Sequence, residues 1–176
     1  MYLHTNSLCS HCIKTPLLHC FEPVGRSSSQ SHIFYTCVGL AIRVDDYVGM
    51  KDHIDAHLAT IRGENWSWIL DCRGISAANI FDMKTIIEFI KYIREKYGNQ
   101  FEKLHLLNSI KPLDILLKNV LPLFPTMTYS IVHYRDESSL LVLEELLQNG
   151  IPRNVSYWIS KSMLKKPVKG QWTSLE

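Results

Sequence analysis

The chain has 176 residues, of which 46% are hydrophobic and 20% charged, and its formal net charge is +2 at pH 7. A disordered chain would contain fewer apolar residues, and a small disulfide-bonded scaffold would contain far more cysteine. No apolar run reaches the roughly 20 residues that span a bilayer. The charge alone is too balanced to indicate a nucleic-acid partner, which is therefore not the favoured interpretation. We expect one globular domain.

The N-terminus shows no basic stretch followed by an apolar run, as a secretory signal would. The five cysteines are an odd number, which favours reduced thiols over a disulfide framework. We therefore expect an intracellular, cytoplasmic protein.

Residues 1–31 form a Cys/His-rich arm with no hydrophobic period of 2 or 3.6. Residues 25–29 are typical of a linker. The order of the arm is expected to depend on docking or on a bound ion.

The arm contains a candidate zinc site. Cys9-x-x-Cys12 lets two thiolates reach one ion, and His19-Cys20 supplies further donors of the types that zinc prefers. The candidate ligand set is Cys9, Cys12, His19 and Cys20, with His11 or His4 as substitutes. The alternative is three reduced cysteines in a flexible or docked arm. A thioredoxin-like role is disfavoured because the Cys-x-x-Cys does not follow a strand.

Regular elements begin at residue 32. A β-branched and aromatic run predicts a buried strand over residues 32–42, and Asp45 or Asp46 is expected to cap the next helix. That helix has an apolar stripe of Ile54, Leu58 and Ile61 and is expected to end at Gly63. His53 and His57 share one of its faces at a spacing used by metal ligands, but two solvent-facing histidines are the favoured interpretation.

The same patterns continue through the rest of the chain. The predicted elements are a strand at 66–70, a helix at 83–97 ended by Gly98, a strand at 104–107, a helix from Lys111 to Leu121, a strand at 128–134 and a helix capped by Asp136 that ends before Gly150. Alternating strands and helices predict an α/β fold with a mixed, mostly parallel sheet and helices packed on it.

Five segments, in order, resemble the CRAL-TRIO lipid-binding family. The segments are Trp68–Gly74, Ile93–Tyr97, Leu106–Asn108, Lys118–Phe124 with Thr128, and Leu146–Pro152. The resemblance implies a sheet that floors an apolar cavity covered by a gate helix. The helical lobe that precedes this domain in the family is replaced here by the short arm, so the expected division is an arm at 1–31, a CRAL-TRIO-like domain at 32–155 and a basic aromatic tail at 156–176.

The resemblance implies a ligand pocket under the gate helix. Its expected lining is Leu113, Leu116, Leu117, Val120, Phe124, Ile86, Ile90, Leu106 and Thr128. The expected function is non-catalytic binding of a fatty acid or phospholipid, for transfer or sensing. Ile131 occupies the position of the family's phosphate-binding lysine, which argues against inositol-lipid transfer.

The alternative is a closed core that serves as a protein-interaction scaffold for a small GTPase or another protein. No nucleophile elbow, phosphate loop or dinucleotide motif is present, so we do not expect an enzyme. Asp71 and Arg73 could contact a head group, but a turn-stabilising aspartate beside a surface arginine is the favoured interpretation.

The tail combines cations with aromatic residues. The aromatic residues Tyr157 and Trp158 precede Lys161, Lys165, Lys166 and Lys169, and Trp172 follows them. These side-chain types suit peripheral contact with an anionic membrane. A solvated tail held by one tryptophan is the commoner explanation, and nucleic-acid binding by the same residues is a third alternative.

Overall fold

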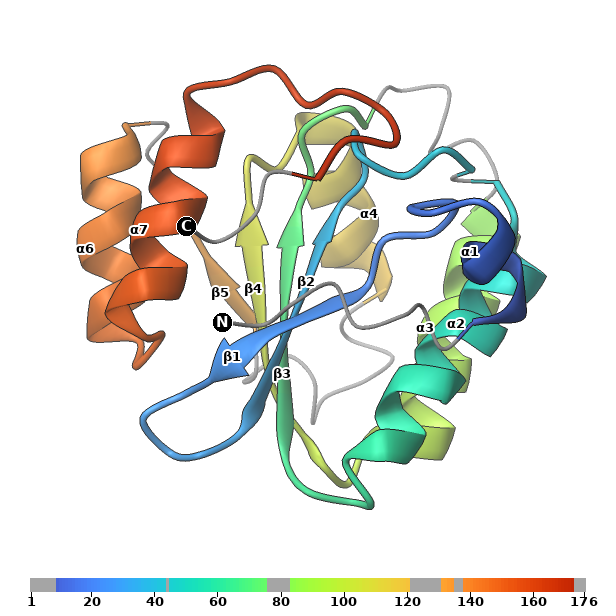
Figure 1. The fold of residues 1–176 in the computed structure, drawn as a ribbon. Helices are drawn as coiled ribbons and strands as arrows, with labels where there is room; N and C mark the ends of the chain where they lie inside the picture. Colours follow the sequence, from blue (N-terminus) through green and yellow to red (C-terminus); the bar gives the residue numbers. More distant parts are fainter. Residues whose placement is uncertain (1–8, 44, 76–82, 121–130, 135–137, 173–176) are drawn as a thin grey trace.

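The computed structural model describes residues 9–43, 45–75, 83–120, 131–134 and 138–172. They form an α/β unit with a five-stranded mixed sheet and helices on both of its faces, as the sequence predicts (Figure 1). The strands are β1 (Glu22–Arg26), β2 (His32–Cys37), β3 (Trp66–Asp71), β4 (Phe101–Leu107) and β5 (Ile131–His133). The helices are α1 (Ser10–Lys14), α2 (Tyr47–Thr60), α3 (Met83–Tyr97), α4 (Lys111–Val120), α6 (Ser139–Gln148) and α7 (Arg153–Met163).

The strands lie in the sheet in chain order. β2 to β5 run parallel, and β1 pairs antiparallel with β2 at one edge. Pro23 and the register shift that follows it are tolerated in β1 because an edge strand uses only one row of its hydrogen-bonding groups. Parallel strands that are covered on both faces contain nearly continuous runs of apolar residues, as β2 and β3 do.

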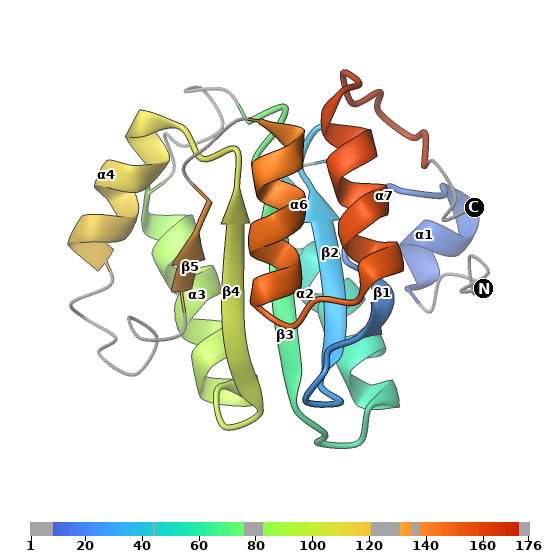
Figure 2. The same cartoon turned by 90° about the vertical axis from the view of Figure 1, so that its left-hand side faces the viewer.

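Successive side chains point to opposite faces of the sheet, so two cores form. On one face Ile33, Tyr35 and Ile69 pack against α6 and α7. Figure 2 shows this helix pair in front of the sheet. On the other face Phe34 packs with α2 and α3, and Leu106 packs with α4.

Several predicted helix boundaries are confirmed. Asp46 caps α2, and its side chain accepts a hydrogen bond from the Gly49 amide at 2.9 Å. Gly98 follows α3 directly, and α4 begins at Lys111 as expected. The structure gives α6 the N-cap Ser138; Asp136, the predicted cap, lies outside the described residues.

Other boundaries differ from the prediction. β2 ends at Cys37, five residues early, and β4 begins at Phe101, three residues early. The predicted linker is wrong for Gly25 and Arg26, which belong to β1.

The solvated-tail alternative is wrong for residues 156–163, which belong to α7 (Arg153–Met163). Val155 and Ile159 are fully buried and Trp158 is nearly so, because they lie three and four positions apart on one helical face. No helix in the described part of the chain is long and apolar enough to cross a membrane.

Candidate metal centre

Four buried side chains meet where α1 lies against α2. They are Cys9, Cys12, His19 and His53, and their donor atoms all lie within 4.8 Å of one another. Sγ of Cys12 lies 3.6 Å from Nδ1 of His19 and 3.4 Å from Nδ1 of His53, and Sγ of Cys9 lies 3.9 Å from Nδ1 of His19. Neither cysteine forms a disulfide. The group could hold a metal ion.

The first two donors share the turn that starts α1. Cys9 is the residue before the helix and Cys12 is its third residue, so both face the same side of one helical turn. The chain then reverses through Leu17, which has a φ of 57°, and reaches His19. Ile42 and Arg43 donate backbone hydrogen bonds to the carbonyls of Leu17 and Leu18 at 2.9 Å, which fix this reversal against the loop before α2.

His19 is oriented by the start of α2. Its Nε2 lies 3.3 Å from Oδ2 of Asp46, while the other oxygen of Asp46 caps the helix. Because the hydrogen bond from the Gly49 amide holds the pKa of Asp46 below its usual value, this carboxyl is ionised and can only accept. Nε2 of His19 therefore carries the proton, and Nδ1 offers its lone pair to the thiols.

His53 has the same orientation on the opposite side of the site. Its Nε2 lies 3.3 Å from the carbonyl oxygen of Phe21, which can only accept a hydrogen bond. Nδ1 of His53 is therefore unprotonated and faces Cys12. Each histidine thus presents a lone pair inward and an N–H group to a fixed acceptor outside, which is the usual arrangement of metal-binding histidines.

Burial keeps both rings neutral. It lowers the pKa of His53 to about 3, with further lowering from the neighbouring His57 and His19. Burial also lowers the pKa of His19, against the opposing effect of Asp46. Neutral imidazole is the form that binds metal ions, so both donors are ready at pH 7.

The structure brings together three of the four predicted ligands. Cys20 instead turns toward the sheet, where its Sγ accepts a hydrogen bond from the Cys37 amide at 3.4 Å. His53 takes the fourth place in the group. Of the two substitutes, His11 is exposed and His4 lies outside the described residues.

The prediction of solvent-facing histidines on α2 is wrong, because His53 and His57 are 0% and 2% exposed. Nε2 of His57 has no hydrogen-bond partner among the described atoms. Glu22 and His53 complete a second, smaller group of donors around His57. Burial raises the pKa of Glu22 to about 7.

The residues predicted to line a lipid pocket lie mostly at the interface of α4 with the sheet. Leu113, Leu116 and Leu117 pack with Leu106 in one cluster, joined by Ile90 on α3. The three α4 leucines are 2–8% exposed. Ile86 and Val120 lie on α3 and α4, and their side chains are not described. Phe124 and Thr128 lie outside the described residues.

Asp71 and Arg73 form a buried network at the carboxyl end of β3. Asp71 is fully buried and accepts from Tyr35 Oη at 2.7 Å, Arg73 Nε at 2.8 Å and Asn108 Nδ2 at 3.0 Å. Arg73 also donates to the backbone carbonyls of Ser162 and Lys165. The predicted surface position of Arg73 is therefore wrong. Its side chain is 15% exposed, and its hydrogen bonds connect the end of α7 to the sheet.

No protein-family model matches the sequence, and no curated protein matches it.

Proposed function

We propose that Cys9, Cys12, His19 and His53 bind one Zn²⁺ ion in a structural site. The observation that carries this proposal is the orientation of the two histidines, each with Nδ1 toward the thiols and Nε2 on an acceptor outside. Without a metal ion, the thiol proton of Cys12 can serve only one of the two nitrogen lone pairs that face it. One zinc ion would satisfy all four donors together.

The donor spacing supports a tetrahedral ion. Zn–S and Zn–N bonds of about 2.3 and 2.0–2.1 Å place sulfur and nitrogen about 3.5 Å apart in a tetrahedral site. Three of the four sulfur–nitrogen separations are 3.4, 3.6 and 3.9 Å. A tetrahedral set of two thiolates and two imidazoles favours zinc over the harder cations, which prefer oxygen ligands.

A structural role follows from the number of donors and from their burial. Four protein ligands fill a tetrahedral shell and leave no open position for a substrate. The ligands are 0–2% exposed. The ion would cross-link Cys12 to His53, 41 positions later. Closing a loop of that size in the unfolded chain corresponds to about 4 kcal/mol of stabilisation in the chain-entropy model.

The test compares the two possible fourth ligands. Protein expressed with zinc and dialysed should contain one zinc per chain, and X-ray absorption should show two sulfur and two nitrogen neighbours. His53→Leu should lose the ion, whereas Cys20→Ala should keep it, because the thiol of Cys20 faces Cys37.

Two outcomes would refute the site. One is a wild-type protein that contains no zinc and that shows no absorption from bound Co²⁺ when it is titrated with Co²⁺. The other is a zinc-loaded protein with three sulfur neighbours, which would restore Cys20 to the ligand set. The X-ray absorption result needs no variant, so it decides the question even if a substitution unfolds the chain.

A further inference from the structure

A nine-residue segment follows α7 and crosses the carboxyl end of the sheet. We call residues 164–172 the strap (Figure 1). Its start is held by Arg73, which donates to the carbonyls of Ser162 and Lys165. Its far end is held by a hydrogen bond of 2.8 Å from the Gly170 amide to the Leu40 carbonyl.

Packing fixes the strap between these hydrogen bonds. Pro167 packs directly against Gly39, because a Cβ added to Gly39 would lie 2.5 Å from Cγ of Pro167. The ring of Trp172 lies 5.9 Å from that of Tyr35 and 5.2 Å from that of Trp158. The backbone of the strap is therefore attached to the sheet along its length, which leaves the other side chains facing outward.

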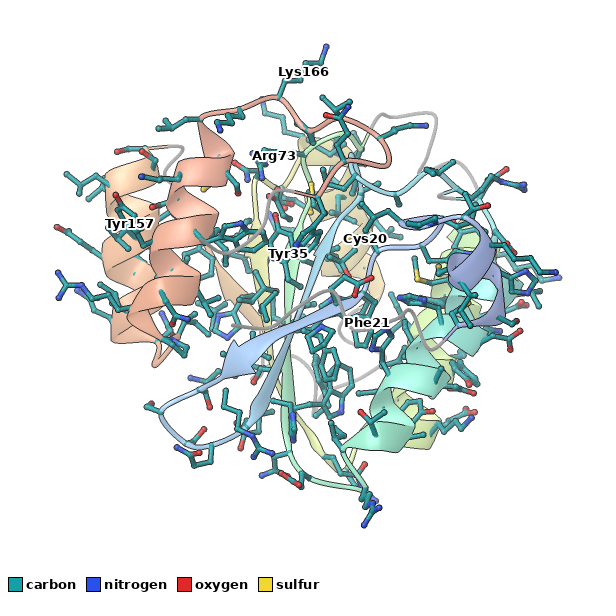
Figure 3. All side chains as sticks on the ribbon, in the orientation of Figure 1. Cys20, Phe21, Tyr35, Arg73, Tyr157 and Lys166 are labelled. Carbon is teal, nitrogen blue, oxygen red and sulfur yellow. The ribbon has the colours of Figure 1, made fainter. Side chains whose placement is uncertain are left out.

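The outward side chains are both apolar and cationic. Leu164 is 74% exposed and Val168 is 51% exposed. Lys165, Lys166 and Lys169 are exposed beside them, and Figure 3 shows Lys166 extending away from the molecule. Exposing two apolar residues on an anchored segment gains nothing for folding, so they are available to a partner.

The charged residues of α7 and the strap have one sign. Residues 153–172 include Arg153, Lys161 and the three strap lysines but no aspartate or glutamate. The nearest acidic residue before this stretch in sequence is Glu145 of α6, and the one that follows it is Glu176. This local excess of positive charge complements a surface of phosphate or carboxylate groups.

We propose that the strap binds the surface of bilayers rich in anionic phospholipid, with Leu164 and Val168 inserted among the head groups. The lysines alone would suit any polyanion. The two apolar side chains separate the candidates, because a bilayer rewards their insertion and a nucleic-acid backbone does not. Each lysine near an anionic leaflet strengthens binding by about five-fold, so the three strap lysines together contribute about 100-fold.

Vesicle co-sedimentation tests the proposal on the full chain. Vesicles of phosphatidylcholine and phosphatidylserine in equal amounts should bind the protein, and vesicles of phosphatidylcholine alone should not. Lys165→Gln/Lys166→Gln/Lys169→Gln should weaken binding by about 100-fold. Leu164→Ser/Val168→Ser should weaken it at least ten-fold and should also reduce the binding that persists at high salt.

Matched controls lie elsewhere on the surface. Lys84→Gln/Lys91→Gln removes exposed lysines of α3, and Ile115→Ser removes a side chain of α4 that is 61% exposed. Both should bind the anionic vesicles as the wild type does. Far-UV circular dichroism of every variant separates loss of binding from loss of the fold.

Three results would overturn the proposal. One is equal binding to both kinds of vesicle, and another is unchanged binding by Leu164→Ser/Val168→Ser. The third is tighter binding to an oligonucleotide than to anionic vesicles, which would assign the surface to nucleic acid. The zinc measurement does not depend on the strap, so either proposal can fail alone.

Discussion

Gly49→Ala reverses the usual effect of this substitution in a helix. Alanine is favoured over glycine in a helix interior by about 0.8–1 kcal/mol, so the change should normally stabilise α2. A Cβ at Gly49, however, would lie 2.6 Å from Cε1 and 2.7 Å from Nε2 of His19, and 2.6 Å from Oδ2 of Asp46. The added methyl group therefore occupies the place where the His19 ring meets the Asp46 carboxylate.

The size of the effect follows from two contributions. Overpacking of a tight interior costs about 1–3 kcal/mol, which exceeds the gain in helix propensity and leaves the metal-free chain destabilised by about 0–2 kcal/mol. Separating His19 from Asp46 also removes the partner that orients a metal ligand, which typically lowers metal affinity 10–100-fold. That factor corresponds to about 1.4–2.8 kcal/mol of stability in the zinc-bound protein.

Two measurements separate these contributions. Urea unfolding in the presence of a chelator gives the stability of the metal-free chain, and competition with a chromophoric chelator gives the zinc affinity. Val48→Ala is the matched control, because Val48 is the neighbouring residue on α2 and is 74% exposed. A Gly49→Ala protein that is more stable than the wild type and binds zinc equally well would refute the geometry assigned to His19.

Three further predictions concern the sheet. Arg73→Met should lower the free energy of unfolding in urea by about 3–5 kcal/mol, because it leaves the buried Asp71 carboxylate without its cation. Adding Asp71→Asn should recover part of this loss. A loss below about 1 kcal/mol for Arg73→Met would contradict the prediction. Burial lowers the pKa of His105 to about 4, so the unfolded chain binds a proton that the folded chain excludes, and stability should fall as the pH drops from 6.5 to 4. His105→Gln should remove roughly 3 kcal/mol of that decline, measured as the change in unfolding free energy between the two pH values, and an unchanged decline would refute the cause. If α4 covers a ligand, native mass spectrometry of the wild type should show co-purified lipid, and Leu117→Asp should remove it. A wild-type chain without bound lipid would favour the closed core and the scaffold alternative.

Local patterns were sufficient for most of the helices and strands. The stripe of α3 repeats every three or four residues and the proline of α4 lies in its first turn, so both are local signals, and both predictions are confirmed. β1 was missed because Pro23 and Gly25 are rare in strands away from an edge, and its edge position depends on the other strands. The stripe of α7 was present in the sequence, but Lys161, the lysines that follow the helix and the aromatic residues suggested a tail.

The candidate metal centre was only partly visible for a related reason. Cys9, Cys12 and His19 lie within eleven consecutive residues, so their spacing alone predicts that they can meet. His19 and Cys20 are neighbours whose side chains point to different parts of the structure, toward α2 and toward β2. His53 joins the group only because α2 packs beside α1, which no local spacing indicates.

The separation of the four donors along the chain also determines when the site can form during folding. In a classical zinc finger the ligands are close in sequence, and the ion drives folding of a short segment. Here His53 lies 41 residues beyond Cys12, on a helix that packs against Phe34 of β2. A complete donor set therefore exists only after the first βα unit has assembled, so metal uptake during refolding should trail the burial of the aromatic core.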